Sequence, residues 1–139
     1  MLLTREFKMR VWYVDTDQMG IVHHSNYARY YEAARSDLMR SMGVSYAEME
    51  RQGVIMPVLD VYSKFHASAH FDELISVRIM IEDLPRARIL FHFEIYNEER
   101  QLLNTGRVTL GFLHGDTRRP TRAPEWFVQL LLDNADNSV

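Results

Sequence analysis

The sequence has 139 residues, of which 47% are hydrophobic and 25% are charged, with a formal net charge of −3 at pH 7 and no cysteine. This size and composition predict one folded domain over residues 1–139, and the acidic balance argues against a protein that binds nucleic acid through its phosphates. The lack of cysteine excludes disulfides and favours the reducing cytoplasm. No segment has the apolar run of a signal peptide or a membrane span, so we expect a cytoplasmic protein without membrane insertion.

The first predicted element is a strand in EFKMRVWYV, residues 6–14. Apolar side chains at positions 7, 9, 11 and 13 recur with a period of two, which is typical of a half-buried strand. This alternation places Tyr13 on the core side. The strand is expected to break at DTDQMG, residues 15–20, because Asp, Thr, Gln and Gly favour local hydrogen bonds and unusual backbone angles.

The main helix is predicted over residues 27–42, where apolar side chains recur at three- and four-residue steps. The buried stripe consists of Tyr27, Tyr30, Tyr31, Ala34, Leu38, Met39 and Met42. The charged residues of this segment are expected to lie mostly off the stripe; they are Arg29, Glu32, Arg35 and Asp37. Ser25 or Asn26 is expected to cap the start of the helix, and Gly43 to end it in a left-handed conformation.

The remaining elements are a short helix, several strands and a C-terminal helix. SYAE, residues 45–48, has the spacing of a capping box and predicts a helix that ends near Gly53. Residues 55–69 are extended with an unclear buried face, and alternating apolar residues predict strands in residues 74–83, 88–97 and 102–114. Pro124 starts a helix over residues 124–133, and residues 134–139 are expected to fray. The order predicts an α+β fold with a mainly antiparallel sheet packed on one helix.

Polar chemistry is concentrated in YVDTDQMGIVHHSNY, residues 13–27, between the first strand and the main helix. A helix N-terminus presents unpaired N–H groups that can hold the oxyanion of a thioester or ester under attack. Asp15 or Asp17 could attack the carbonyl or polarise a water, and a histidine at position 23 or 24 could orient water or protonate the leaving group.

Other interpretations of the same residues remain open at this point. Asp15 and Asp17 could be backbone acceptors in a turn, and His23 and His24 could be ordinary structural or surface histidines. The four side chains could also form a metal site, although two of them are adjacent and no HxxxH or HExxH spacing occurs. We therefore predict no metal.

The segment VWYVDTDQMGIVHHSNYARYYEAARSDLM, residues 11–39, resembles the signature of the 4-hydroxybenzoyl-CoA thioesterase family, and is most similar to its Tol-Pal-associated acyl-CoA thioesterases. The resemblance extends more loosely from about residue 5 to about residue 130. It implies a hotdog fold, in which an antiparallel sheet wraps one long helix. It further implies homodimers or homotetramers in which two sheets join edge to edge and active sites form between subunits.

Position by position, the resemblance implies that Asp17 is the catalytic carboxylate, as nucleophile or general base. Tyr13 and His24 match its partners, and the backbone N–H near residue 24 matches the oxyanion donor. The residues expected to contact acyl-CoA are Gly20, Val22, Tyr27, Arg86, Arg88, Arg119 and Arg122, the arginines as receptors for coenzyme A phosphates. Asp15 is expected to be structural, and no cofactor is required.

The function predicted from these residues is hydrolysis of an acyl-CoA thioester to the free acid and coenzyme A. A first alternative is a hotdog module that binds acyl-CoA without cleaving it. A second is a dehydratase acting on a 3-hydroxyacyl thioester, which also combines a histidine with a carboxylate. The sequence does not determine the acyl chain length or the choice between coenzyme A and acyl carrier protein.

Overall fold

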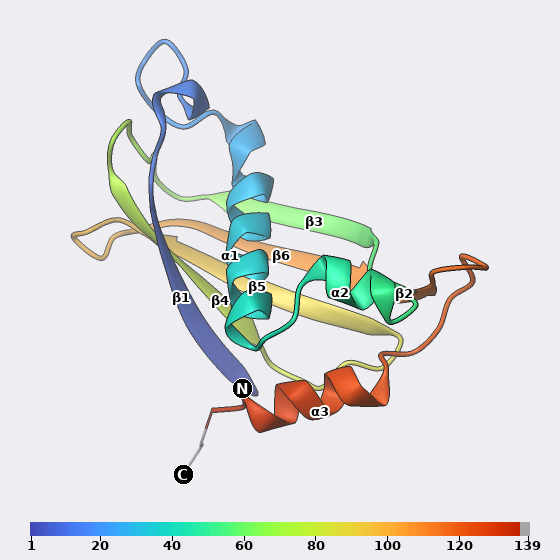
Figure 1. Cartoon of the computed structure of the whole chain (residues 1–139). Coiled ribbons are helices and arrows are strands. Elements are labelled where there is room, and N and C mark those ends of the chain that lie inside the picture. The colour runs from blue at the N-terminus through green and yellow to red at the C-terminus, as the bar shows by residue number, and fades with distance from the viewer. Residues whose placement is uncertain (137–139) are drawn as a thin grey trace.

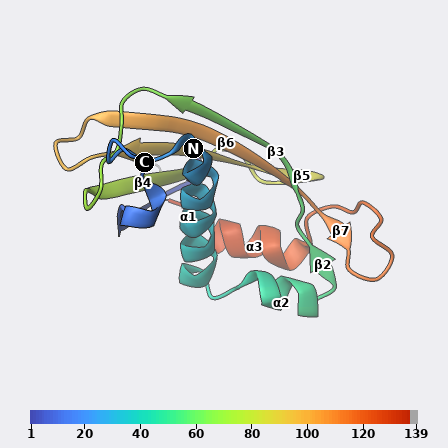
Figure 2. The same cartoon turned by 90° about the horizontal axis from the view of Figure 1, so that it is seen from above.

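The structure is a computed structural model that describes residues 1–136. A five-stranded sheet with the order β1-β4-β5-β6-β3 forms one layer, and every neighbouring pair is antiparallel. Its strands are β1 (Leu3–Arg10), β3 (Val58–Phe65), β4 (Leu74–Ile81), β5 (Arg88–Tyr96) and β6 (Leu102–Gly111). Figures 1 and 2 show the sheet curving over helix α1 (Tyr27–Ser41), with all helices on the same side. The predicted α+β hotdog arrangement is confirmed.

Smaller elements complete this side of the molecule. Helices α2 (Tyr46–Arg51) and α3 (Glu125–Asp133) flank α1, and a two-stranded ribbon joins β2 (Val54–Ile55) to β7 (Leu113–His114). Two short 3₁₀ helices, η1 (Tyr13–Asp15) and η2 (His24–Asn26), lie between β1 and α1. Within the described residues, no helix is long and apolar enough to cross a membrane.

The periodicities that predicted the core are confirmed. Helix α1 buries the expected stripe against the sheet, with Tyr30 and Tyr31 fully inaccessible to solvent. Strand β4 buries its predicted face, and strand β5 does the same with Ile89, Phe91 and Phe93. In β5 this agreement follows because one face meets the core and the other is more exposed, whereas in β4 Ser76 and Met80 on the second face are buried as well.

Two expectations about side-chain direction are wrong. Tyr13 is 75% exposed, because β1 ends at Arg10 and residues 13–15 form η1, which rotates the following side chains out of the strand alternation. Arg35 is only 6% exposed, although its charge predicted a place off the buried stripe. Helix α2 covers this flank of α1, and the Arg35 Nε donates to the Tyr46 hydroxyl over 3.3 Å.

The helix ends agree with the sequence in part. Gly43 has a φ of 86° just past α1, and Ser45 Oγ accepts a hydrogen bond from the Glu48 N–H at the start of α2. Neither candidate N-cap residue of α1 caps it through its side chain. Asn26 occupies the N-cap position, but its amide nitrogen donates to the backbone carbonyl of Asp15 instead. This bond ties the start of α1 to the preceding loop.

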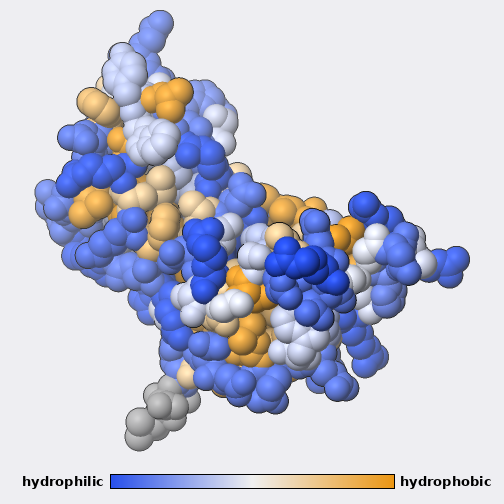
Figure 3. Space-filling model, in the orientation of Figure 1, coloured by the Kyte–Doolittle hydropathy of each residue, from blue (hydrophilic) through white to orange (hydrophobic). Residues whose placement is uncertain are grey.

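Strand β3 explains why the buried face of residues 55–69 was unclear. It lies at the edge of the sheet and, among the described strands, pairs only with β6. Exposed apolar side chains occur along its length: Val58, Leu59, Val61, Tyr62 and Phe65. Figure 3 shows hydrophobic surface (orange) along the ridge that carries β3 in Figure 1. Both faces of this strand therefore contain apolar residues, which removes the alternation.

The middle of α1 meets the sheet through a buried polar cluster. The Tyr31 hydroxyl bonds to Ser63 Oγ at 2.8 Å and to Asn104 Oδ1, and the Asn104 amide donates to Ser63 Oγ at 2.9 Å. The Tyr31 ring stacks on Phe93 with centroids 4.5 Å apart. This arrangement requires glycine at position 106, because a Cβ there would stand 2.7 Å from Tyr31 Cε2 and closer still to the Tyr31 Cζ and hydroxyl oxygen.

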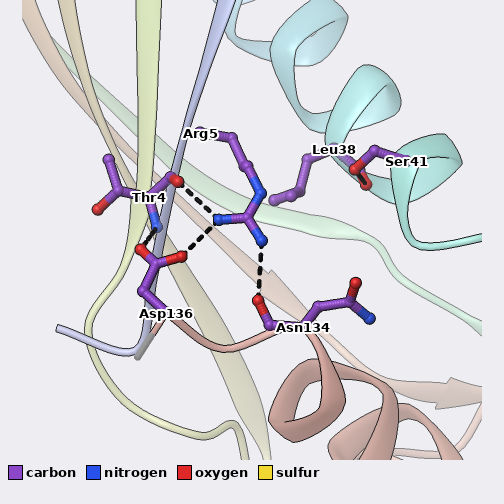
Figure 4. Close-up of polar contacts among 6 residues, drawn as sticks. All are labelled: Thr4, Arg5, Leu38, Ser41, Asn134 and Asp136. Atoms are coloured by element: carbon purple, nitrogen blue, oxygen red, sulfur yellow. Dashed lines mark hydrogen bonds and ion pairs between the residues drawn. The ribbon is translucent and has the colours of Figure 1, made fainter. Parts of the chain in front are cut away.

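The chain beyond α3 is held against β1, contrary to the expected fraying of residues 134–136. The Asp136 N–H donates to the Leu2 carbonyl at 2.9 Å, and its carboxylate receives the Thr4 N–H and the Arg5 guanidinium. Arg5 also donates to the Asn134 carbonyl (Figure 4). Hydrogen bonding to Arg5 lowers the pKa of Asp136. The predicted fraying of residues 137–139 lies outside the described residues.

Candidate active site

Asp17 lies at the base of a tight turn between β1 and α1. Its N–H donates to the Ile21 carbonyl at 2.9 Å, its carbonyl accepts from the Gly20 N–H at 3.0 Å, and Gly20 has a φ of 76°. One carboxylate oxygen, Oδ1, accepts from the Met19 N–H at 2.8 Å. Within residues 1–136, the other oxygen receives no hydrogen bond. The turn therefore orients the carboxylate through one oxygen and leaves the second available.

Asp15 has a different role, as the sequence predicted. It is 2% exposed, and its carboxylate accepts from the Tyr30 hydroxyl at 2.9 Å and pairs with the Arg29 guanidinium. Its backbone carbonyl accepts from the His23 N–H at 2.9 Å and from the Asn26 amide at 2.8 Å. Asp15 thus ties the turn to the first two turns of α1. Burial, and then the hydrogen bond to Asp15, raise the pKa of Tyr30.

The two histidines precede α1 and are both exposed. His23 Nδ1 accepts from the Ser25 N–H at 3.2 Å, and the His23 and His24 rings lie 4.2 Å apart. His24 is the first residue of η2. Among the hydrogen bonds of the described residues, the His24 N–H has none. A free N–H at a helix start is the kind of donor that an oxyanion requires.

Aromatic side chains surround this helix start. Tyr27 is 3% exposed and its ring lies 5.2 Å from that of Phe65, which also faces His24 at 6.4 Å. Burial raises the pKa of Tyr27. Tyr13 meets Phe71 edge to face at 5.3 Å on the outer side of the turn.

Residues 65–71 form a wall of the site that the sequence did not reveal. Val22 donates its N–H to the Ala69 carbonyl at 2.9 Å, and Ile21 forms an antiparallel bridge with His70. Phe65, at the end of β3, faces the helix start. The only signal for this wall was the histidine-rich FHASAH, residues 65–70, whose direction the sequence left unclear.

Within one chain, the predicted phosphate-binding arginines lie at the opposite end of the sheet from the Asp17 turn. Arg86 belongs to the β4–β5 connection, and the Ala123 N–H donates to its carbonyl at 2.6 Å, which brings the two arginine clusters together. The opposite end of β4, Leu74, pairs with Arg10 and leads toward the Asp17 turn. An eight-residue strand is about 26 Å long. Figure 1 shows the β4–β5 connection and the turn after β1 at opposite ends of the sheet. The arginines and Asp17 of one chain therefore do not belong to one site.

The predicted site residues therefore fall into two groups. Asp17, Gly20, Val22, His24 and Tyr27 lie together around the start of α1, with Tyr13 at its exposed margin. The arginines form a separate, exposed group; they are Arg86, Arg88, Arg119 and Arg122. Residues 1–136 contain no group of three His, Asp or Glu side chains arranged to hold a metal ion.

Residues 11–131 match the family model of the thioesterase-like superfamily. The chain belongs to this superfamily. This match confirms the predicted family and includes every residue of the candidate site.

Other members of the superfamily are similar over nearly the whole chain. The DHNA-CoA thioesterase of Staphylococcus aureus superposes with a TM-score of 0.82 at 34% identity, covering 94% of each chain. The acyl-CoA thioester hydrolase YbgC of Escherichia coli O157:H7 is 28% identical over 120 residues, which are 86% of this chain and 90% of that protein. The acyl-CoA thioesterase YbgC of Helicobacter pylori is 26% identical over 132 residues, covering 89% and 97%. These similarities agree with the predicted acyl-CoA thioesterase subgroup.

Proposed function

We propose that this thioesterase-superfamily protein hydrolyses the thioester bond of an acyl-CoA, with Asp17 as the reacting carboxylate. The observation that carries the proposal is the geometry of the turn. One Asp17 oxygen is anchored by the Met19 N–H, and within residues 1–136 neither the second oxygen nor the His24 N–H at the adjoining helix start has a hydrogen-bond partner. The names of the similar proteins support the substrate class.

The chemistry can follow either of two routes. In the first, the free oxygen of Asp17 attacks the thioester carbon, the C–S bond breaks, and water hydrolyses the resulting anhydride to the acid. In the second, Asp17 accepts a proton from a water that attacks the same carbon directly, and the C–S bond then breaks to release the acid and coenzyme A, whose sulfur takes up a proton. In both routes the His24 N–H would hold the carbonyl oxygen as negative charge develops, which typically lowers a barrier by about 2.7–4 kcal/mol. His24 and Tyr13 are the proposed polar partners.

We further propose that the site is completed by a second copy of the chain, in a homodimer or homotetramer joined through β3. The Val58 end of β3 lies beside Leu110, at the arginine end of the sheet, and the Phe65 end lies at the Asp17 end. Antiparallel pairing of two β3 strands about a two-fold axis would place each Val58 end against the other copy's Phe65 end. The arginines of one subunit would then lie near the Asp17 of the other, ready for coenzyme A phosphates.

The test is release of free thiol from short, long and aromatic acyl-CoAs, comparing the wild type with Asp17→Asn. Because the chain has no cysteine, a thiol reagent reports only the coenzyme A released. We expect Asp17→Asn to lower turnover about 10²–10⁴-fold with little change in KM. Asp37→Asn, on α1 and away from the turn, is the matched control and should retain wild-type turnover.

Turnover near the wild-type value in Asp17→Asn would refute the proposed role of this carboxylate. If no acyl-CoA is hydrolysed by the wild type but acyl-CoA raises its melting temperature, the protein is a binding module. Formation of an enoyl product from a 3-hydroxyacyl thioester, without thiol release, would instead identify a dehydratase. Cytoplasmic location stays a prediction.

A further inference from the structure

Strand β1 forms the second edge of the sheet, opposite β3, and among the described strands it pairs only with β4. Backbone groups of successive strand residues point to opposite edges, so those of every second residue of β1 face away from β4. These residues are Thr4, Glu6, Lys8 and Arg10. A row of unpaired N–H and C=O groups at a sheet edge is a template for another strand. The outer edge of β1 is therefore a potential site of chain association.

The residues after α3 cover one end of this edge. The Thr4 N–H donates to Asp136 Oδ2 at 2.8 Å, and the Thr4 carbonyl accepts from Arg5 Nη1 at 2.8 Å. Arg5 also pairs with Asp136 Oδ1 at 2.6 Å and donates to the Asn134 carbonyl at 2.8 Å (Figure 4). Both outward backbone groups of Thr4 are thus occupied. We call Arg5, Asn134 and Asp136 the latch.

The rest of the edge is open and has complementary charges. Within residues 1–136, no hydrogen bond engages the outward backbone groups of Glu6, Lys8 or Arg10. If two β1 strands paired antiparallel about a two-fold axis at Phe7, each Glu6 would stand opposite the other copy's Lys8. Opposite charges in directly opposed positions stabilise a strand pair. In the same register, each Thr4 would stand opposite the other copy's Arg10.

We propose that the latch prevents a second copy of the chain from pairing with β1. While the latch is closed, Thr4 cannot form its ladder bonds, and only the Glu6–Lys8 pairs remain, which is too short a ladder to hold two chains. When it is open, the whole ladder can form. Each copy would then have two self-complementary edges, β1 and the proposed β3 interface, and association would not close. The latch thus confines association to β3.

The test is the mass of the protein at increasing concentration, measured by light scattering. Asp136→Ala removes the acceptor of the Thr4 N–H and the partner of Arg5. We expect it to form species larger than the wild-type oligomer at a concentration about tenfold lower than the wild type does. Arg5→Met opens the latch from its other side and should behave in the same way.

Asp133→Ala is the matched control. It removes an exposed carboxylate of the same segment, which within residues 1–136 bonds only to Gln129, and it should behave as the wild type does. Wild-type masses in folded Asp136→Ala and Arg5→Met, or equal growth in Asp133→Ala, would overturn the proposal.

Charge variants then identify the paired edge. Added to Asp136→Ala, Lys8→Glu would set like charges against each other and should return the mass to that of the wild type. Adding Glu6→Lys as well restores opposite charges and should restore growth. Growth that Lys8→Glu does not stop, or that the second exchange does not restore, would overturn pairing through β1.

A charge on β3 separates this proposal from the β3 interface. In Asp136→Ala with Val61→Lys, only β1 remains available, so association should stop at two chains. Growth beyond two chains in this background would overturn pairing through β1. None of these masses depends on hydrolysis at Asp17, so failure of the latch and failure of the proposed activity are separately visible.

Discussion

Replacing Gly106 by alanine tests how tightly α1 is seated on the sheet. The new Cβ would lie 2.7 Å from Tyr31 Cε2, whereas ordinary contacts of such atoms are 3.4–4 Å. The Tyr31 ring must therefore retreat. Retreat separates its hydroxyl from Ser63 and Asn104 and disturbs its stack on Phe93.

The expected loss of stability has two parts. Overpacking of a core typically costs about 1–3 kcal/mol. Leaving buried polar groups of the cluster without a partner costs about 1–3 kcal/mol more. We therefore expect Gly106→Ala to lower the free energy of unfolding by roughly 2–6 kcal/mol, which is a large share of the roughly 5–15 kcal/mol that stabilises a typical protein.

Urea denaturation followed by circular dichroism measures this loss. Gly111→Ala is the matched control on the same strand, since its Cβ would stand 3.4 Å from the flexible Leu59 side chain, and it should change stability by less than about 1 kcal/mol. In a Tyr31→Leu background, which removes the ring, the further effect of Gly106→Ala should largely disappear. An equal effect in both backgrounds, or one no larger than that of Gly111→Ala, would refute the reasoning.

Three further predictions concern charge, pH and assembly. Asp15→Asn should lower the free energy of unfolding by about 1.5–3 kcal/mol, because the buried acceptor of Tyr30 loses its charge. A change below about 0.5 kcal/mol, measured by urea denaturation, would show that the Asp15 carboxylate does not hold the turn against the helix. Because the pKa of Tyr30 is raised above its ordinary value of 10.0, the folded state keeps a proton that the unfolded state loses above pH 10. Stability is therefore unaffected by this group below pH 10 and falls above it, by up to about 1.4 kcal/mol per pH unit, and Tyr30→Phe should flatten that fall when urea curves at pH 9 and 11 are compared. Identical slopes in the two proteins would show that Tyr30 does not cause the fall. Val61→Lys, which places a charge in the middle of β3, should shift the mass measured by light scattering toward that of one chain, and an unchanged oligomer would exclude β3 as the interface.

The sequence predicts best which face of a single helix or strand is buried. Alternation in β5 and the stripe of α1 were readable because burial on one side imposes a period on the chain, and β4 keeps its alternating Ile and Val residues although Ser76 and Met80 on its other face are also buried. The same rule failed at Tyr13, where the alternating pattern continues past the last ladder pair and a 3₁₀ turn redirects the side chain. It failed for β3 because an edge strand with apolar residues on both faces has no period.

The candidate site divides in a similar way. Asp17 and His24 are close in sequence and are joined by a short closed turn, so their proximity was predictable from one segment. Phe65 reaches the same place from a distant strand, which no local pattern indicates. Arg35 sits one helical turn from the buried Tyr31 and was placed outside the core only because of its charge. The proposed role of the arginine clusters depends on a second copy of the chain, and no local pattern of one chain tests that relation.

The bonds around Asp15 also determine how the site moves. Its carboxylate holds Tyr30 in the first turns of α1, and its carbonyl holds the His23 N–H and the Asn26 amide. The first turn of α1 cannot unfold while the preceding loop keeps its conformation, since both depend on these hydrogen bonds. Amide hydrogens around Asp17 should therefore exchange with solvent at the rate set by opening of the helix, as one cooperative unit. A substitution that loosens α1 anywhere along its length would then loosen the proposed reacting carboxylate without touching it.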